Sequence, residues 1–198
     1  MSSAWWLGHR CMLGLAASSL TTQNIRRTGE CVLNLPSASL VAHVDRIART
    51  TGSDPVPERK RRWGYRHVAD KFAEAGLQAI ASELVSPPRV AECPVQMEPT
   101  LDRSQPFGNG PFAYALEVAI ERVHVDEAIL AEPNRIDPDA WRPLIMSFQH
   151  FYGLTPHKLQ KSELAQIPEP PTASRHVLLG RCDVCPSATP SASAWWHD

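Results

Sequence analysis

The feature that most constrains the fold is an alternation of apolar and polar residues in the second half of the chain. Apolar side chains recur at every second position from Phe112 to Ile120, and a period of two is typical of a β-strand with one buried face. The next apolar pair, Val123 and Val125, is out of phase with that set. Because a one-residue slip turns the buried face to solvent, this change of phase predicts a β-bulge near Glu121–Arg122.

Shorter patterns predict further strands and a set of short helices. The predicted strands are Arg10–Leu15, Glu30–Leu35 and Val90–Met97, the last at an edge or a bulge because it contains Pro94. The first predicted helix is capped by Thr21 or Thr22, runs through Arg27 and ends at Gly29. Two more are predicted from Ser39 to Ala48 and over Arg66–Ala75. A short helix is predicted from Asp137 and Pro138 through Trp141, and Thr155 and Pro156 mark a further helix start. Eighteen prolines keep these elements short. Strands and short helices without a regular βαβ alternation favour an antiparallel β barrel or sandwich with helical inserts.

Length, charge and hydropathy narrow the class of protein. A chain of 198 residues builds one ordinary domain. The 20 Lys and Arg residues balance 21 Asp and Glu residues, which gives no support to a nucleic-acid-binding protein. No apolar run approaches the roughly 20 residues that span a bilayer, so an integral membrane protein is not expected. Beyond Ile167 the chain is aperiodic and rich in Pro, Ser and Ala, and we expect this tail to be poorly ordered.

The five cysteines are irregularly spaced and do not indicate a disulfide framework. Cys182 and Cys185 form one CxxC pair, so a zinc site is the alternative to accidental spacing, but a structural zinc needs four ligands and there is no second pair. A signal peptide is another alternative, because Arg10 precedes a short apolar stretch. We prefer the strand interpretation of that stretch and expect a reducing, cytoplasmic location.

Hydroxyl and amide side chains gather where the first predicted strand gives way to a helix, in the segment Ser18–Asn24. The first turn of a helix offers unpaired backbone N–H groups and the positive end of the helix dipole, and hydroxyls add further donors. A phosphate needs such donors. Ordinary helix capping is the alternative, because it uses the same residue types.

A set of short motifs follows in order along residues 1 to about 155. They are Met1–Trp5, Ser19–Asn24, Thr28–Leu35, Gly64–His67, Asp70–Phe72, Ala75–Leu77, Pro88–Pro94, Arg122–Val125, Pro143–Met146 and Phe151–Tyr152. This ordered set resembles the flavin reductase-like family, the FMN-binding split barrels that include flavoredoxin.

The resemblance implies a mainly β fold, an antiparallel Greek-key split barrel with short helical inserts, that binds FMN non-covalently as a homodimer. It also implies hydride transfer from NAD(P)H to the flavin, and then to a free flavin, a partner or a small-molecule acceptor. The cofactor carries the hydride in this chemistry, and the protein supplies binding and orientation. The resemblance places Ser2 and Ser3 beside the isoalloxazine ring of FMN. It places Ser19 and Thr21, with their neighbours Ser18 and Thr22, at the phosphate. Asn24 belongs to the same motif and is expected to fix the turn.

Two departures from the family pattern bear on flavin binding. Leu20 stands where many relatives have lysine, which removes a point charge from the phosphate site and leaves hydroxyls, N–H groups and Arg26 or Arg27. Met1–Ala4 resembles an interior stretch of the family, so the β-hairpin that usually precedes it is expected to be missing. Residues 1–155 would then be an incomplete domain with an unpaired edge and little bound flavin, followed by a short helix and the tail in residues 156–198.

Other conspicuous residues are expected to have ordinary structural roles. His124 is expected to face solvent or to be hydrogen-bonded, Cys93 to be a small core residue, and at least one of Trp5 and Trp6 to pack in the core. The basic run Arg59–Arg62 is expected to be a solvated face, with a contact to the phosphate of NADPH as the alternative. The leading hypothesis is an FMN-dependent oxidoreductase. A non-enzymatic flavin-binding module and an inactive fragment are the alternatives.

Overall fold

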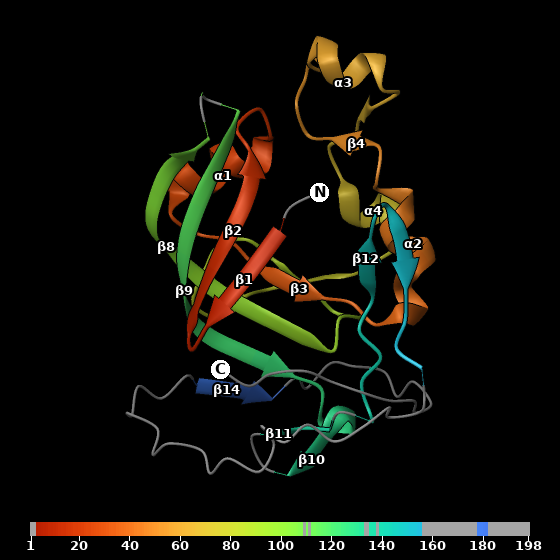
Figure 1. The fold of residues 1–198 in the computed structure, drawn as a ribbon. Coiled ribbons are helices and arrows are strands. Elements are labelled where there is room, and N and C mark those ends of the chain that lie inside the picture. Colours follow the sequence, from red (N-terminus) through yellow and green to blue (C-terminus); the bar gives the residue numbers. More distant parts are fainter. Residues whose placement is uncertain are drawn as a thin grey trace.

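Strand β9, Ala113–Val125, lies at the centre of the main sheet and pairs on both edges (Figure 1). One edge takes β8, Val95–Phe107, and the other takes β2, Arg10–Ala16, both antiparallel to β9. Strands β1, Ser3–Leu7, and β3, Leu33–Leu35, extend the sheet, whose order is β1-β2-β9-β8-β3. The computed structural model describes residues 3–108, 110, 112–132, 135–137, 139–155 and 178–181.

The C-terminal part of the chain contributes one more strand to this sheet. Strand β14, Leu178–Arg181, runs parallel to β9 and pairs with Arg122–Val125. The helix start expected at Pro156 and the CxxC pair at Cys182 and Cys185 lie outside the described residues. The poorly ordered tail therefore stays a prediction for the remainder of that segment.

The predicted bulge in β9 is confirmed. Glu98 of β8 pairs with Arg122, whereas the next residue, Pro99, pairs with Ile120, so Glu121 is the extra residue on β9. A bulge restores the buried phase of a strand after an odd insertion. The side chains of Ile120 and Val125, on either side of the bulge, are both buried as a result.

The core fills the face of the sheet that α1 covers. Alternate residues of β9 supply its centre, as the period-two pattern predicts. The buried apolar core comprises Cys11, Leu13, Ile25, Cys31, Val95, Met97, Leu116, Val118, Ile120, Val125, Ile129 and Trp141. Phe112 is not part of it: β9 begins one residue later, and the Phe112 side chain is 73% exposed.

The helices and 3₁₀ turns of the described residues are α1, Leu20–Thr28; the 3₁₀ turn Ala38–Leu40 followed by α2, Val41–Arg46; α3, Glu58–Arg62; α4, Lys71–Ala75; and the 3₁₀ turn Glu127–Ile129. The helices expected over Ser39–Ala48 and Arg66–Ala75 are shorter than predicted, and α3 forms where no helix is predicted. Helix α1 begins at Leu20 with Ser19 as its N-cap, so the cap predicted at Thr21 or Thr22 is wrong, while Gly29 ends the helix in the left-handed conformation as predicted.

Three other predicted boundaries are corrected by backbone pairing. The helix predicted over Arg66–Ala75 is helical only from Lys71, because Arg66–His67 form strand β5 against β4, Thr50–Thr51. The strand predicted over Glu30–Leu35 is reduced to β3, with Glu30 making an isolated bridge to Thr100. Asp139 and Ala140 form a turn rather than the helix predicted through Trp141.

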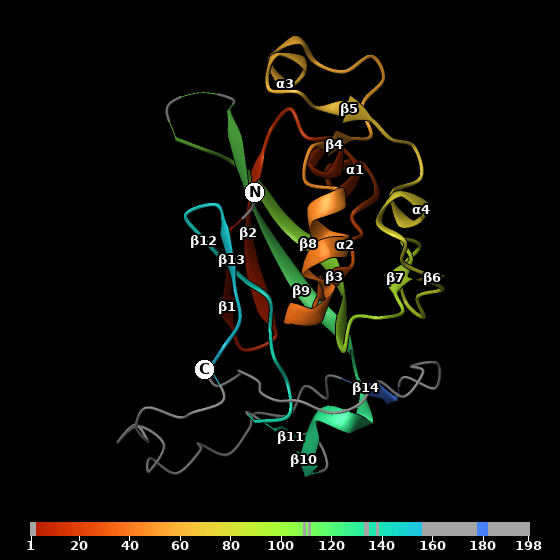
Figure 2. The same ribbon diagram turned by 90° about the vertical axis from the view of Figure 1, so that its right-hand side faces the viewer.

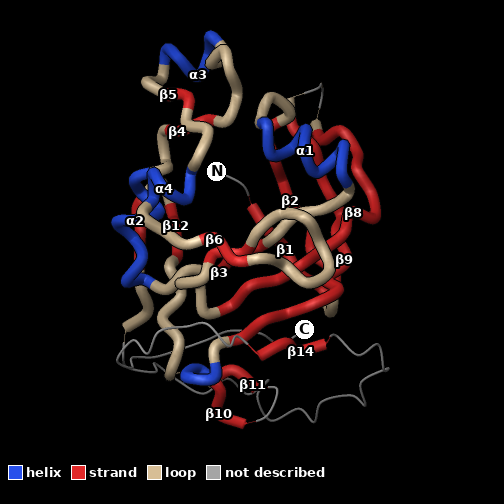
Figure 3. Tube along the Cα trace, turned by 180° about the vertical axis from the view of Figure 1, so that it is seen from behind, coloured by secondary structure: helices blue, strands red, loops and turns tan. Residues whose placement is uncertain are grey.

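The short strands complete the structure around the central sheet. They are β6, Ala79–Ile80; β7, Arg89–Val90; β10, Leu130–Glu132; β11, Arg135–Ile136; β12, Ile145–Ser147; and β13, His150–Tyr152. The β12–β13 hairpin and β1 lie on one side of the molecule, and α1, α2 and α4 lie toward the other (Figure 2). The view from behind looks onto the side of the molecule that carries these helices (Figure 3). Within the described residues no helix is long and apolar enough to cross a membrane.

Candidate functional site

The turn from β2 into α1 presents backbone donors at one end of the sheet. The Ser19 N–H donates to the Ala16 carbonyl at 3.0 Å, and the first helical hydrogen bond runs from the Gln23 N–H to the Ser19 carbonyl at 3.1 Å. The N–H groups of residues 20–22 precede that bond, as in the first turn of any helix. They carry the positive end of the helix dipole and can bind an anion.

The hydroxyl groups of this turn divide into two kinds. Thr22 is 1% exposed, and its Oγ1 donates to the Ala16 carbonyl at 2.8 Å, so this hydroxyl fastens the helix to the end of β2. Ser19 makes no capping bond through its side chain. Ser18 and Thr21 are exposed, and within the described part of the chain neither their hydroxyls nor that of Ser19 have a protein partner. These three hydroxyls are available to a ligand.

We expect Thr22→Val to lower the free energy of unfolding by about 0.5–1.5 kcal/mol, because it removes a buried hydrogen bond to the Ala16 carbonyl, which keeps the Ser19 N–H as its other donor. Thr21→Val is the matched control on the exposed face of the same helix, and it should change stability by less than about 0.5 kcal/mol. Urea denaturation of the two variants measures both values. Equal losses would show that the Thr22 hydrogen bond does not hold this turn.

The other polar residues of the motif lie farther along α1. Asn24 is exposed, and its side-chain oxygen accepts from Arg27 at 3.4 Å, while its carbonyl accepts from the Thr28 hydroxyl. The Arg26 guanidinium stacks on the Tyr114 ring, 4.0 Å from its centroid. Both arginines are in the last turn of the helix, and both are engaged by neighbours rather than held at the first turn.

The backbone of Ser3 reaches the same end of the sheet as the helix start. Ser3 pairs with Gly14 on β2, two residues before Ala16, and Ala17 donates its N–H to the Phe112 carbonyl at 2.9 Å. The structure therefore brings the Ser3 backbone and the Ser18–Thr21 turn to one end of β2. Ser2 lies outside the described residues.

Leu20, at the start of α1, packs against a neighbouring segment. Its Cδ2 atom is 2.8 Å from the position that a Cβ would occupy on Gly52, so the loop after β4 lies directly against the first residue of the helix. A side chain at position 52 would collide with Leu20. Glycine at this position lets the two segments approach.

A buried ionic network, which sequence reasoning missed, lies at the opposite end of β9. Glu98 is fully buried on β8, and its carboxylate accepts the backbone N–H groups of Glu83 and Leu84 at 2.6–3.0 Å. His124 Nε2 lies 2.6 Å from Glu98 Oε1, and Arg89 Nε lies 3.4 Å from the same oxygen. One carboxylate thus joins the two central strands to the loop before β7.

The charge states in this network follow from burial and hydrogen bonding. Burial alone would raise the pKa of Glu98, but the N–H groups of Glu83 and Leu84 together with His124 outweigh it and hold that pKa below its usual value. Burial lowers the pKa of His124, against the opposing effect of Glu98. Glu98 is therefore ionised at neutral pH, and a neutral His124 donates to it from Nε2.

The structure also shows the surroundings of the other residues for which ordinary structural roles were expected. His124 is 1% exposed, so it does not face solvent, and the expected hydrogen bond is present at Nε2. Cys93 is buried, as expected of a small core residue. Trp6 packs against the core while Trp5 is 63% exposed, which confirms that one of the two is a core residue. The arginines of Arg59–Arg62 are exposed, in agreement with a solvated face.

Comparison with known proteins gives a consistent result. The family model for the flavin reductase like domain matches residues 1–155. The uncharacterized protein YdfE of Bacillus subtilis (strain 168) is 37% identical over 155 residues, which cover 78% of this chain and 74% of that protein.

Two solved structures share the fold. Flavoredoxin of Desulfovibrio vulgaris (Miyazaki F) is 22% identical with a TM-score of 0.61, over 80% of this chain and 76% of its own. A split-barrel protein from Shewanella frigidimarina is 17% identical with a TM-score of 0.61, over 85% of this chain and 76% of its own.

Proposed function

Because the chain belongs to the flavin reductase-like family, we propose that it is an FMN-binding oxidoreductase that accepts hydride from NADH or NADPH. Its mainly β, split-barrel-type fold and its flavin-related oxidoreductase role are those of the family. We propose three further points: that the flavin is FMN, that NADH or NADPH is the reductant, and that a flavin or a small molecule is the acceptor.

The observation that carries the proposal is the set of unpartnered donors at the start of α1. Among the residues that the structure describes, the hydroxyls of Ser18, Ser19 and Thr21 have no protein partner, and they lie beside the N–H groups of the first helical turn. A structural cap would use the Ser19 hydroxyl internally, and this one does not. The donor set fits a phosphate, which accepts several hydrogen bonds and is stabilised by a helix N-terminus.

The chain's own residues have binding and positioning roles in this proposal. Ser19 and Thr21 would hold the FMN phosphate, and Thr22 keeps the turn in place through the Ala16 carbonyl. Bound FMN would accept a hydride from the nicotinamide and pass the electrons on. Ser2 and Ser3 remain the proposed neighbours of the isoalloxazine ring.

Titration of the purified protein with three flavins tests this assignment. FMN should bind more tightly than riboflavin, because only FMN carries a terminal phosphate monoester for the first turn of α1. FAD, in which the flavin phosphate is joined to AMP through a diphosphate and is no longer a monoester, is the third ligand and distinguishes the two flavin cofactors. Riboflavin that binds as tightly as FMN would contradict a phosphate site at this turn.

We also propose a homodimer that uses the side of the molecule carrying β1 and the β12–β13 hairpin (Figure 2). Phe148, at the hairpin tip, is 94% exposed with φ of 47°, and Trp5 and Tyr152 are also largely exposed. A bulky residue in the left-handed region is unfavourable, and so is its exposure to water. Burial against a second copy would offset that exposure, and an isologous interface buries each such residue twice.

Sedimentation at micromolar concentration with FMN present should therefore show a dimer. Phe148→Asp should shift the protein toward monomer, because it places a carboxylate in the apolar contact. Trp63→Asp, which makes the same kind of change at an exposed aromatic residue at the end of α3, is the control and should leave the dimer intact. A wild-type protein that sediments only as monomer would contradict the interface.

A further inference from the structure

Residues 49–67 form an extension of the fold, here called the α3 arm. Strands β4 and β5 pair in parallel at its base, where the Arg66 N–H donates to the Arg49 carbonyl at 3.1 Å. Helix α3 lies in the connection between the two strands. Figures 1 and 2 show this helix at the outer end of the arm, apart from the main sheet and with no other described element over it. The arm therefore holds α3 out into solvent.

The α3 arm carries a positive charge that the rest of the chain does not share. It contains six Lys and Arg residues but two Asp and Glu residues, a net charge of +4, whereas the whole chain carries −1 and the rest of it therefore −5. Arg61 and Arg62 share one carboxylate, that of Glu58. Within the described residues, Arg49 and Arg59 have no carboxylate partner. The outer end of the arm thus has more guanidinium groups than acids to pair with them.

An exposed tryptophan stands among these arginines. Trp63 directly follows α3, and its side chain is 57% exposed. The Arg59 guanidinium lies over the Trp63 ring, 4.7 Å from its centroid. Gly64 then turns the chain back with φ of 75°, and Arg49 Nη1 lies 3.8 Å from the position that a Cβ would occupy on this glycine. The two arginines without acidic partners therefore lie at the turn that presents Trp63.

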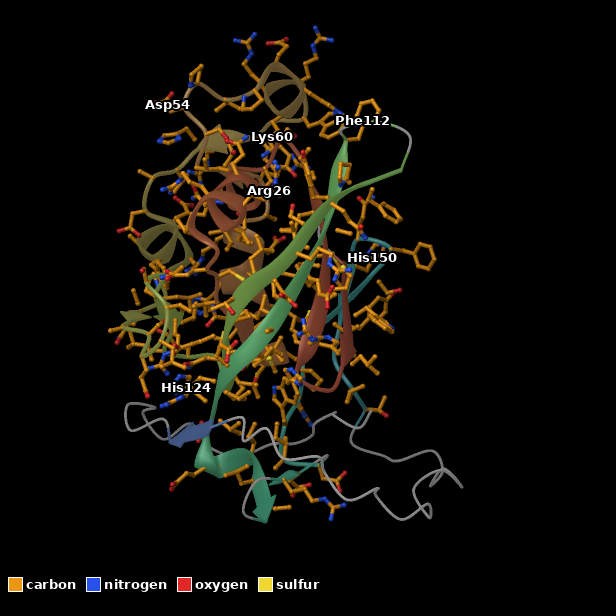
Figure 4. All side chains as sticks on the ribbon, turned by 90° about the vertical axis from the view of Figure 1, so that its left-hand side faces the viewer. Arg26, Asp54, Lys60, Phe112, His124 and His150 are labelled. Carbon is orange, nitrogen blue, oxygen red and sulfur yellow. The ribbon has the colours of Figure 1, made fainter. Side chains whose placement is uncertain are left out.

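The lysine and the second acid of the arm lie away from this outer surface. Lys60 is partly buried, and its Nζ donates inward to Thr51 Oγ1 at 3.4 Å. Asp54 is exposed, and Figure 4 shows it on the opposite side of the arm from Lys60. The outer surface of the arm is therefore formed by arginines and one tryptophan.

These features fit a protein partner better than a small ligand or a nucleic acid. Small-molecule sites are concave and bury most of the ligand, whereas α3 stands out from the fold. A nucleic acid would meet the net charge of −5 on the rest of the chain, which repels phosphates. Protein interfaces are enriched in arginine and tryptophan, and the residues whose removal costs most binding are often of these two types.

We propose that the outer end of the α3 arm docks onto an acidic surface of another protein. Trp63 packs against an apolar side chain at the centre of the contact, and Arg49, Arg59 and Arg61 pair with carboxylates around it. The inference goes beyond the proposed function, because the contact requires neither a bound flavin nor a nicotinamide. It can therefore succeed or fail independently of that function.

A fluorescently labelled acidic peptide tests the docking surface on the full-length protein. The peptide has one phenylalanine flanked on each side by four glutamates, and its binding is followed by fluorescence anisotropy. We expect saturable binding in about 0.01 M salt that weakens steeply toward about 0.15 M, because the Debye length falls from about 30 Å to about 8 Å. A thymidine oligonucleotide of equal charge, NADPH and the unlabelled peptide are added as competitors.

Variants separate a docking contact from general attraction between charges. Trp63→Ala changes no charge and should weaken peptide binding about fivefold or more, as expected of a residue at the centre of an interface, whereas Trp63→Phe should keep most of the affinity. Arg59→Gln should weaken binding about threefold. Arg103→Gln on β8 is the matched control, because it removes the same charge from a side chain that is 72% exposed and outside the arm. It should leave the affinity within about twofold.

Three results would overturn the inference. The first is that the peptide does not bind at low salt. The second is that Arg103→Gln weakens binding as much as Arg59→Gln while Trp63→Ala leaves it unchanged, which would indicate general electrostatics. The third is displacement of the peptide by the oligonucleotide or by NADPH at a lower concentration than by unlabelled peptide, which would assign the arm to a nucleic acid or to the coenzyme. Trp63→Phe and Arg59→Gln keep the test decisive if Trp63→Ala does not fold.

Discussion

Glu98→Ala is expected to lower the free energy of unfolding by about 3–5 kcal/mol, the usual cost of removing one partner from a buried ionic pair. The carboxylate is fully buried, and its loss leaves the N–H groups of Glu83 and Leu84 without acceptors. It also leaves the positive charge of Arg89, which lies 3.4 Å from Glu98, without its nearest carboxylate. Urea denaturation at neutral pH measures the loss.

Glu92→Ala is the matched control for this experiment. The Glu92 carboxylate also accepts a backbone N–H, from Gln78 at 3.0 Å, but it does so at the surface. Its removal should cost no more than about 1 kcal/mol, because water replaces the lost acceptor. A Glu98→Ala protein as stable as Glu92→Ala would show that the buried network does not anchor the loop to the sheet.

The same network gives the stability a pH dependence. The pKa of Glu98 is lowered in the folded state, so its contribution is complete above the ordinary value of 4.5 and is lost as the pH falls through the lowered value. The pKa of His124 is lowered from 6.5, so the unfolded chain binds a proton first, and stability also falls as the pH drops below about 6.5. We expect acid to destabilise the protein, and Glu98→Ala to flatten the lower part of that curve.

The second large effect is expected at the start of α1. Ser19→Ala combined with Thr21→Ala should weaken FMN binding at least tenfold, because each hydrogen bond to a charged group is worth about 1.5–3 kcal/mol. Riboflavin, which lacks the phosphate, should be affected much less. Flavin fluorescence titrations of both ligands give the comparison. The two hydroxyls have no partners within the described residues, so their loss should leave stability nearly unchanged.

Equal losses for FMN and riboflavin would contradict the assignment of Ser19 and Thr21 to the phosphate. Thr22→Val serves as the contrast on the same helix. It should lower stability through the Ala16 carbonyl while changing the ratio of FMN to riboflavin affinity little. Together the two experiments distinguish the proposed ligand contacts of Ser19 and Thr21 from the structural hydrogen bond of Thr22.

The parts of the fold that the sequence predicts well are those that depend on a single regular period. The alternation through β9 and the change of phase at Glu121 predict both the strand and its bulge, because one buried face fixes the position of every side chain. Gly29 likewise marks the end of α1, since glycine adopts its φ of 76° without strain. Family motifs add the split-barrel-type fold, which periodicity alone does not distinguish from a sandwich.

Other features depend on contacts between distant segments and leave little trace in local patterns. The five-residue helix α3 is too short for a helical period to identify. The helix predicted over Arg66–Ala75 starts only at Lys71, because Arg66 and His67 form β5 beside Thr50 and Thr51. Glu98 pairs in register with Arg122, and His124 is its diagonal neighbour on β9, so their contact is visible only once the register of β8 on β9 is known. Gln96 and Glu98, two polar residues on one face of a strand within an apolar region, are the signal that could have indicated a buried network.

In the candidate site too, some features could be predicted from the sequence and others required the structure. The Ser18–Asn24 segment was found from its residue types and its place between a strand and a helix. The separation of Thr22 from Ser19 and Thr21 required the structure, because a threonine that binds the Ala16 carbonyl and one that faces outward look alike in sequence.

Anaerobic reduction of the bound flavin tests the central proposal most directly. The purified protein, loaded with FMN and freed of excess flavin, is mixed with NADH or NADPH while the visible absorbance of the flavin is recorded. We predict that at least one nucleotide bleaches the bound flavin, faster than it bleaches free FMN, and that admission of oxygen restores the colour. A protein that holds FMN but keeps it oxidised with both nucleotides would be a flavin-binding module, and that result would contradict the proposed oxidoreductase activity.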